Sequence, residues 1–270
     1  MKQLTLACMF FGLSLLAGRT ARAQGQSGVD PNALIERILT VDSAQRARIN
    51  DVTFDAELIV GEMKKDGFVE KERYLKKVYV KYLPDTTLFH ETYLEYFKEG
   101  VKQSDKERVK KARERKEKAR KRHARNIAYP MLRPFQPQYR QDYDIAYKGV
   151  MDARVEGYIC YRFDVTSRVK DAEHINGTYY FEADGFHLVK CDFSPAKLTK
   201  NLMFKMKKLE MTIIYGPAGD NYWLPKQFDL FGKGKAAFLF GVNFAATEYY
   251  RNPVINTGLN AGLFKEESHD

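Results

Sequence analysis

The chain has 270 residues, of which 44% are hydrophobic, 13% aromatic and 30% charged. This composition supplies enough apolar surface for a folded core and excludes a chain that is disordered throughout. Nine prolines and 18 glycines exclude collagen-like and low-complexity classes, and three cysteines are too few for a disulfide scaffold or a four-cysteine zinc site. The composition predicts a folded, β-rich protein.

Residues 1–23 have the pattern of a secretory signal peptide. Lys2 provides a positive start, an apolar run over residues 4–16 follows, and residues 21–23 (Ala-Arg-Ala) form a cleavage signature. The apolar run is shorter than the roughly 20 residues that a membrane-spanning helix needs. We therefore expect a cleaved signal and a periplasmic protein that is not an integral membrane protein. An uncleaved anchor is the alternative.

A helix is predicted over residues 31–46, because Asp30 can cap it and Pro31 suits its first position. Beyond it, apolar and polar residues alternate in ten segments, which predicts half-buried strands. These segments cover residues 52–60, 74–82, 87–97, 143–148, 158–165, 178–182, 187–193, 204–215, 222–231 and 237–249. Short connections favour an antiparallel meander, and Gly232-Lys233-Gly234-Lys235 is interpreted as a turn between two strands.

The predicted fold class is mainly β with helices (α+β), with a strongly curved sheet and the first helix across its hollow. Residues 24–256 are expected to form one domain, and residues 257–270 a flexible tail. The composition is compatible both with an apolar cavity in the hollow and with a filled core, so it does not decide between the two.

The net charge of +10 is concentrated in residues 101–126, which contain thirteen basic and four acidic residues. Ser104 and Glu107 form a capping box, so a basic helix is predicted over residues 105–125. Its few apolar residues form no stripe that could pack firmly, so we expect this insertion to protrude or to lie loosely across the body.

Three interpretations of the basic helix are open. It is a solvated surface insertion, it contacts anionic lipid or another acidic envelope surface, or it binds nucleic acid, which the lack of interleaved aromatic residues disfavours. The residues expected to make an anionic contact are Lys110, Lys111, Arg113, Arg115, Lys118, Arg120, Lys121, Arg122 and Arg125.

Cys160 and Cys191 are predicted to be unbridged and mostly buried. They lie in the first and third strands of an expected three-strand meander, about 9–10 Å apart, because neighbouring strands are spaced about 4.8 Å. A disulfide needs Cα atoms within about 7 Å.

Catalytic motifs are not found in the sequence. The five histidines have no metal-ligand spacing, and neither a nucleophile elbow nor a Walker A loop occurs. We therefore expect neither a metal nor a cofactor, and a protein that is not an enzyme.

Three segments resemble the periplasmic lipoprotein-carrier superfamily (LolA/LolB-like, including RseB-type relatives). Residues 177–182 (Gly-Thr-Tyr-Tyr-Phe-Glu) and 187–190 (His-Leu-Val-Lys) resemble a hairpin of that superfamily, and residues 222–228 (Tyr-Trp-Leu-Pro-Lys-Gln-Phe) resemble its Trp-Leu-Pro strand. The resemblance implies an incomplete antiparallel barrel wrapped around a helix, with a hydrophobic hollow that accepts acyl chains. The insertion at 101–126 departs from the compact pattern.

The leading hypothesis is an exported carrier or binder of lipid or lipoprotein acyl chains. The alternative is an envelope interaction or sensor protein that uses the same scaffold, with a filled core, to bind a protein partner. The residues expected to line an acyl-chain cavity are Phe54, Leu58, Tyr74, Val78, Tyr82, Ile159, Tyr161 and Phe163.

Overall fold

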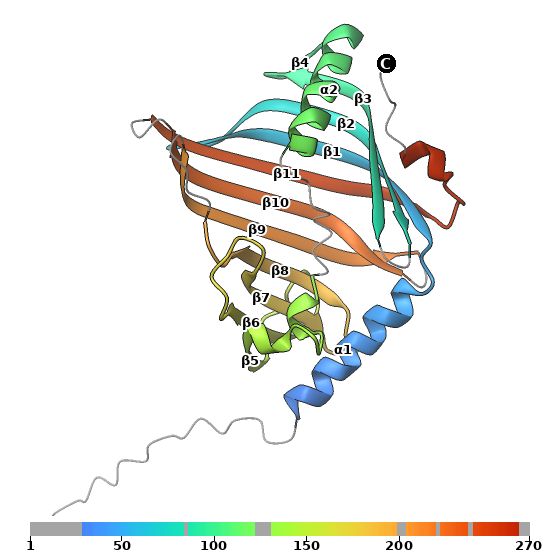
Figure 1. Cartoon of the computed structure of the whole chain (residues 1–270), viewed down its shortest axis with the longest axis vertical. Helices are drawn as coiled ribbons and strands as arrows, with labels where there is room; N and C mark the ends of the chain where they lie inside the picture. The colour runs from blue at the N-terminus through green and yellow to red at the C-terminus, as the bar shows by residue number, and fades with distance from the viewer. Residues whose placement is uncertain are drawn as a thin grey trace, which may run out of the picture.

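The alternating segments of the sequence form one antiparallel sheet, which is open and not closed into a barrel (Figure 1). The computed structural model describes residues 29–83, 86–121, 131–198, 204–219, 222–236 and 240–264. In this part of the chain the sheet has eleven strands in the order β4-β3-β2-β1-β11-β10-β9-β8-β7-β6-β5. The predicted α+β class is confirmed, whereas the predicted signal peptide lies outside the described residues.

The strands and helices have the following bounds. The strands are β1 (Asp51–Lys64), β2 (Gly67–Tyr82), β3 (Thr87–Lys98), β4 (Val101–Lys102), β5 (Tyr143–Val150), β6 (Cys160–Ser167), β7 (Ile175–Glu182), β8 (Leu188–Pro195), β9 (Phe204–Ala218), β10 (Tyr222–Ala236) and β11 (Phe240–Ile255). The helices are α1 (Pro31–Arg46), α2 (Asp105–Lys121) and the short 3-10 helices η1 (Arg133–Phe135), η2 (Arg140–Asp142) and η3 (Ala261–Phe264).

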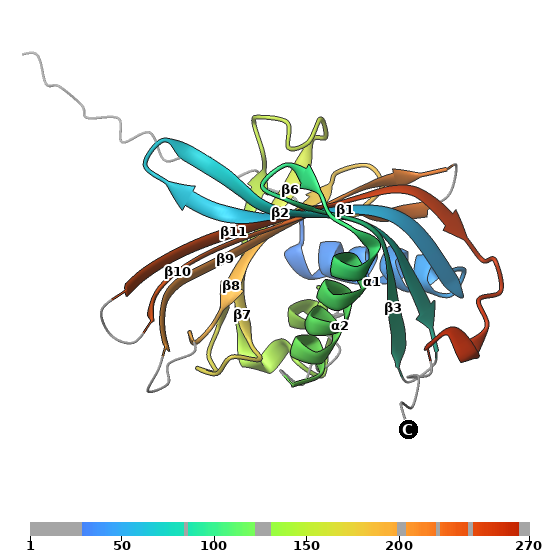
Figure 2. The ribbon, with the colours of Figure 1, turned by 90° about the horizontal axis from the view of Figure 1, so that it is seen from above.

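The sheet consists of two meanders that are joined by the first and last long strands. Strands β1 to β4 and strands β5 to β11 each follow chain order, and β1 pairs with β11. Figure 2 shows the sheet curving, with α1 and α2 both on its concave side. The helices therefore cover only this face, as the alternation of apolar and polar residues requires.

Helix α1 begins as predicted. The Asp30 side chain accepts a hydrogen bond from the backbone N–H of Asn32 at 2.9 Å, and Pro31 occupies the first turn. Leu34, Ile35 and Ile38 are the buried residues of the helix and pack into the concave side.

The segment Gly232-Lys233-Gly234-Lys235 lies within strand β10, so its interpretation as a turn is wrong. Gly232 is buried beneath the ring of Phe244 on β11, and a Cβ atom at this position would lie 2.1 Å from that ring. The glycine is thus explained by the close approach of an aromatic ring and not by a chain reversal.

The two cysteines confirm the prediction of free, buried thiols. Strand β7 lies between the strands that carry them, and its residues Tyr179 and Glu182 pair with Cys191 and Cys160 respectively. Tyr179 and Glu182 are three residues apart on β7, so they lie on opposite faces of the sheet, and each cysteine shares the face of its partner. Cys191 accordingly belongs to the concave cluster, and Cys160 to a separate cluster with Val189 and Trp223.

Asp51 fastens the residues that follow β11 to the sheet. Its buried carboxylate accepts hydrogen bonds from the backbone N–H groups of Thr257, Gly258 and Leu259 at 2.8, 3.0 and 3.1 Å, and from the Thr257 hydroxyl at 3.0 Å. Burial by itself raises the pKa of Asp51, but these hydrogen bonds favour the charged form and hold the pKa below its ordinary value. This part of the predicted flexible tail is therefore structured.

Asp51→Ala is expected to lower the free energy of unfolding by about 1–3 kcal/mol at neutral pH, because it leaves several buried donors without an acceptor. The pKa of Asp51 is lowered by folding, so its contribution is present above the ordinary value of 3.8 and is lost as the pH falls through the folded value. Urea unfolding of both proteins from about pH 7 to about pH 2 should show the difference shrinking with acid.

Asp66→Ala, at an exposed position in the turn after β1, is the control, and we expect it to change stability by less than about 0.5 kcal/mol. A difference between Asp51→Ala and wild type that is the same at neutral and acid pH would contradict the role of the charged carboxylate.

Candidate functional site

The middle of the concave face carries apolar side chains in cross-strand rows. Met211, Leu230 and Ala246 form one row across β9, β10 and β11, and Leu209 and Phe244 flank Gly232 in the next. Residues that pair directly share a face of the sheet. We call the whole set the concave floor, and its members are Met206, Leu209, Met211, Ile213, Phe228, Leu230, Val242, Phe244 and Ala246.

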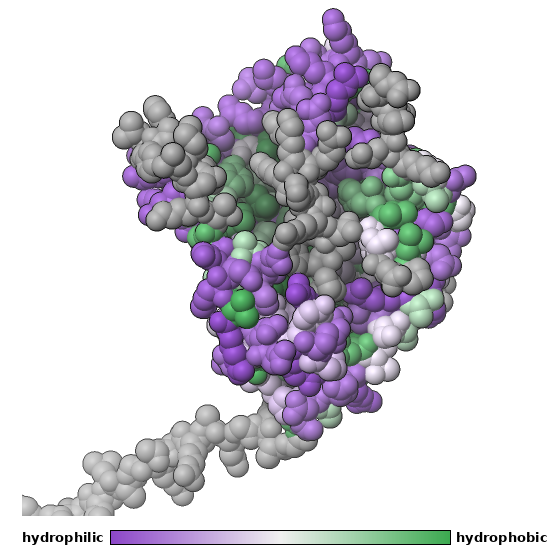
Figure 3. All heavy atoms as spheres, viewed as in Figure 1, coloured by the Kyte–Doolittle hydropathy of each residue, from purple (hydrophilic) through white to green (hydrophobic). Residues whose placement is uncertain are grey.

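The concave floor is only half buried. Each of its side chains is of intermediate exposure, whereas residues such as Lys208, Glu210 and Asn243 alternate with them on the convex face and are exposed. Figure 3 shows a hollowed, hydrophobic area over β9 to β11 on the concave side. Apolar surface that a fold leaves in contact with water in this way is typical of a ligand or partner site.

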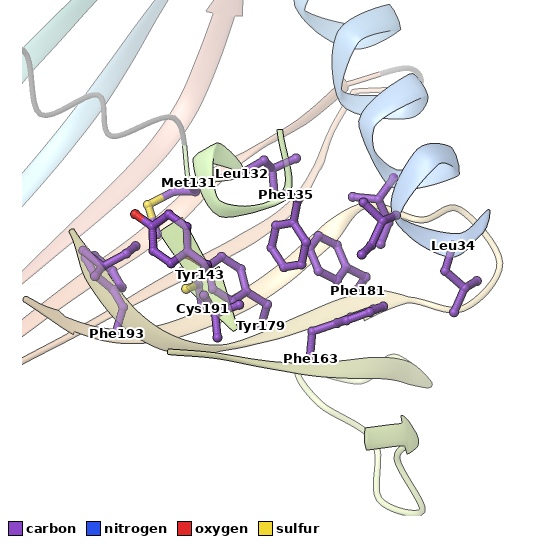
Figure 4. Close-up of a cluster of buried hydrophobic side chains, with 14 residues drawn as sticks. Leu34, Met131, Leu132, Phe135, Tyr143, Phe163, Tyr179, Phe181, Cys191 and Phe193 are labelled. Carbon is purple, nitrogen blue, oxygen red and sulfur yellow. The ribbon is translucent and has the colours of Figure 1, made fainter. Parts of the chain in front are cut away.

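One end of the hollow, over β5 to β8, is filled by aromatic rings (Figure 4). Phe135 of η1 is fully buried, and its ring contacts those of Phe163, Tyr179 and Phe181 edge to face, with centroids 5.7, 5.0 and 5.5 Å away. Met211, Ile213 and Phe228 of the concave floor pack against the edge of this cluster. The apolar face therefore continues from a filled end into a half-exposed middle.

The other end, over β1 to β3, is covered by α2. The Arg115 guanidinium lies 4.8 Å from the centre of the Tyr74 ring, its Nε donates to the Tyr93 hydroxyl at 3.3 Å, and Lys111 pairs with Glu72 at 3.2 Å. Ala112 packs against the same tyrosines. The prediction that this helix protrudes or lies loosely is wrong, because Lys111 and Arg115, together with Ala112, dock it without an apolar stripe.

A buried ion cluster lies beside the site of α2 docking. The Lys76 side chain is 2% exposed and pairs with Glu91 and, at 2.8 Å, with Glu248. Burial lowers the pKa of Lys76, but Glu248 and Glu91 outweigh it and raise the pKa above its ordinary value. Burial likewise raises the pKa of Glu91, and the attraction of Lys76 brings it below its ordinary value. Tyr93, which donates to Glu91 at 2.7 Å, has its pKa raised to about 12 by burial and by that carboxylate.

The eight residues predicted to line an acyl-chain cavity do not form one site. Phe54 and Val78 belong to one buried cluster, Leu58 and Tyr74 to the cluster beneath α2, and Phe163 to the ring-filled end. Tyr161 is half buried and stacks on Phe186, whereas Tyr82 and Ile159 are 38% and 47% exposed.

Two shallow cavities reach some of these residues. One of about 290 Å³, at the β5 edge, is lined by Phe163 together with Tyr147 and Arg140. The other, of about 240 Å³, is lined by Phe54, Leu224 and Tyr250. Both are smaller than the roughly 300–1,000 Å³ of ordinary small-molecule pockets.

The residues predicted for anionic contact fall into three groups. Lys111 and Arg115 face the sheet and use their charges within the chain, because Glu72 and the tyrosines lie opposite them. Lys110 and Arg113 are exposed on the outer side of α2, so for them anionic contact stays a prediction. The side chains of Lys118, Arg120 and Lys121, and the residues Arg122 and Arg125, lie outside the described part of the structure.

The residues of the concave floor were missed by the sequence interpretation, although a signal for them exists. In β9, Leu209, Met211 and Ile213 alternate with polar residues as regularly as those in β1. What the alternation lacks is any indication of which part of the face the helices leave uncovered.

Within the described residues, no group of three or more His, Cys, Asp or Glu side chains could hold a metal ion. None of the helices in that same part of the chain is long and apolar enough to cross a membrane.

No family model matches the chain, and no curated protein matches it in sequence. Solved structures that are similar to this chain include the following three. A DUF1329 family protein from Desulfovibrio piger is 12% identical, with a TM-score of 0.46 and coverage of 88% of this chain and 98% of its own. A putative outer membrane lipoprotein-sorting protein domain from Vibrio parahaemolyticus is 10% identical, with a TM-score of 0.42 over 85% and 97%.

A LolA superfamily protein from Nitrosomonas europaea is 9% identical, with a TM-score of 0.35 and coverage of 88% of this chain and 99% of its own.

Proposed function

We propose that the protein is an exported, non-enzymatic binder or carrier of lipid or lipoprotein acyl chains in the bacterial cell envelope, and that the chains lie on the concave floor. The observation that carries the proposal is the half-exposed apolar surface of β9 to β11, which the docked α2 and the rings around Phe135 leave uncovered. The convex face of the same strands carries exposed polar residues such as Lys208, Lys233 and Asn243, with Phe231 and Ala245 among them.

The chemistry of the concave floor suits an acyl chain. Leucine, methionine and phenylalanine side chains lie in rows across three strands, and the described floor residues include no charged side chain. Burial of each methylene group contributes about 0.8 kcal/mol, so a chain of which only half is covered can still be held. Met206 and Met211 add flexible side chains that adapt to ligands of different shape.

Leu230→Lys is expected to lower the amount of co-purified lipid at least about ten-fold, because a charge in the middle of the floor opposes the burial of several methylene groups. Lipid is measured by native mass spectrometry and by extraction from gently purified protein. Asn243→Lys adds the same charge on the exposed convex face of β11, and we expect it to leave lipid retention unchanged. Wild-type protein that is free of lipid would refute the proposal.

A protein-binding role is the second candidate, and the ring-filled end over β5 to β8 favours it, since a filled core can present a surface without holding a ligand. It predicts a crosslinked envelope protein in the absence of any extracted lipid. The lipid measurement on wild-type protein therefore separates the two roles.

A further inference from the structure

Five exposed lysines lie together where β9 begins and β10 ends. They are Lys205, Lys207, Lys208, Lys233 and Lys235, and we call them the lysine corner. Glu210 is the acidic residue of this region and pairs with Lys208 at 2.8 Å. Within the described structure, no ion pair joins any of the other four lysines to a carboxylate.

The lysine corner contains two pairs of like charges in direct register. Lys208 pairs with Lys233, and Lys205 pairs with Lys235, across the same two strands. Between these two pairs the register of the strands shifts, and Lys207 is the additional residue of β9 at that shift. Residues that are directly opposite have Cβ atoms about 4.5–5.5 Å apart, and like charges at this distance destabilise the sheet. Proteins keep a locally destabilising arrangement of this kind mainly at functional sites.

The same strand ends carry apolar residues on the opposite face. Met206 and Val242 flank Gly234 on the concave side, one position from the Lys205–Lys235 pair, and Leu209 and Phe244 follow in the next row. This edge of the molecule therefore presents ammonium groups on one side and the concave floor on the other. A bilayer with anionic headgroups offers the matching pair of chemistries, phosphate at its surface and acyl chains beneath it.

We propose that the lysine corner docks on an anionic bilayer surface and places the adjoining end of the concave floor against the lipid. The choice of a bilayer as the partner rests on the proposed acyl-chain function. The lysine corner was not among the residues predicted for anionic contact, which all belong to the basic insertion. The inference thus assigns membrane docking to the sheet and not to α2.

The test compares two variants from which equal charge is removed. In the first, Lys205, Lys207, Lys233 and Lys235 are replaced by Gln; Lys208 is kept because it pairs with Glu210. In the second, the exposed α2 residues Lys106, Lys110, Arg113 and Lys116 are replaced by Gln. Binding is measured by flotation with phosphatidylcholine vesicles that do or do not contain phosphatidylglycerol, at low and at high salt.

We expect wild-type protein to bind the phosphatidylglycerol vesicles at low salt and to lose that binding at high salt. The lysine-corner variant should bind at least about ten-fold more weakly, whereas the α2 variant should bind like wild type. Because two repulsive pairs are relieved, the lysine-corner variant should also melt at the same or a higher temperature, so its loss of binding is not a loss of fold.

Equal loss of binding in the two variants, loss in the α2 variant alone, or equal binding to both kinds of vesicle would overturn the inference. Binding to soluble polyglutamate but not to vesicles would overturn it in favour of an acidic protein partner. We expect Leu230→Lys to lose acyl chains from the concave floor but to keep vesicle binding. Failure of the acyl-chain proposal and failure of the docking inference therefore give different results.

Discussion

Lys76→Met is expected to lower the free energy of unfolding by about 3–5 kcal/mol at neutral pH. Lys76 is almost fully buried and pairs with Glu91 of β3 and with Glu248 of β11, so it joins strands from both meanders. A methionine fills a similar volume but carries no charge. The two carboxylates would then stay in a low-dielectric setting without the ammonium group that pairs with both of them, and this is the source of the cost.

The pH dependence of this effect has a definite sign. In wild-type protein, burial raises the pKa of Glu91 but Lys76 brings it below its ordinary value, so the contribution of Glu91 is lost as the pH falls through the folded pKa. In Lys76→Met the effect of burial prevails, the folded pKa is raised, and protonation relieves the cost. The variant should therefore approach wild-type stability as the pH is lowered from neutral, which urea unfolding over a pH series measures.

Lys77→Met is the matched control, because it changes the neighbouring residue on the opposite face. Lys77 pairs with Asp55 at 2.8 Å, but the two side chains are 43% and 45% exposed, and such pairs contribute less than about 1 kcal/mol. Replacing Glu91 and Glu248 by Gln together with Lys76→Met should recover part of the lost stability. A single variant Lys76→Met that is as stable as wild type at neutral pH would contradict the role of the cluster.

The strands and the capped start of α1 could be predicted because short-range sequence patterns determine them. Period-two alternation places each side chain on one face or the other, and Asp30-Pro31 fixes a helix start within two residues. The pairing of β1 with β11 has no such local signal, since Leu58 pairs with Glu248, which lies 190 residues further along the chain. It closes the two meanders into one sheet and could not be inferred from neighbouring strands.

The docking of α2 was missed for a related reason. A search for an apolar stripe cannot detect a helix that docks through Arg115 on a tyrosine ring and Lys111 on a carboxylate. These contacts depend on Tyr74 and Glu72, which lie on strand β2. The sequence of the helix itself therefore gives no indication of its aromatic and acidic partners. Charge alone therefore indicated a loosely attached segment where the structure has a docked helix.

The residues predicted to line a cavity lie on strands to either side of the proposed concave floor. Leu58 and Tyr74 on one side, and Phe163 on the other, have the alternation of a cavity lining, yet α2 and η1 cover them. Whether a half-apolar strand ends in a core or in an open hollow depends on segments far away in the sequence. Phe135, which fills one end, stands in a Pro-rich passage whose three-residue helix has no periodicity to reveal it.

Phe135→Ala is expected to lower the free energy of unfolding by about 3–5 kcal/mol, because it removes a fully buried ring from a cluster that cannot collapse around the space. Phe163, Tyr179 and Phe181 each contact that ring, and all three are held on adjoining strands of the sheet. Phe89→Ala, at a side chain that is 57% exposed, is the control and should change stability by less than about 0.5 kcal/mol.

The same change should enlarge the site. Met211, Ile213 and Phe228 of the concave floor border the cluster around Phe135, so the vacated space adjoins the floor and is lined by apolar groups. A cavity of this kind stays dry and accepts apolar ligands. We therefore expect folded Phe135→Ala to retain longer or more numerous acyl chains than wild type, as read by native mass spectrometry. If the alanine variant does not fold, Phe135→Leu provides a milder version of the same change. Unchanged lipid in a folded variant would contradict the expectation that the ring-filled end adjoins the ligand site.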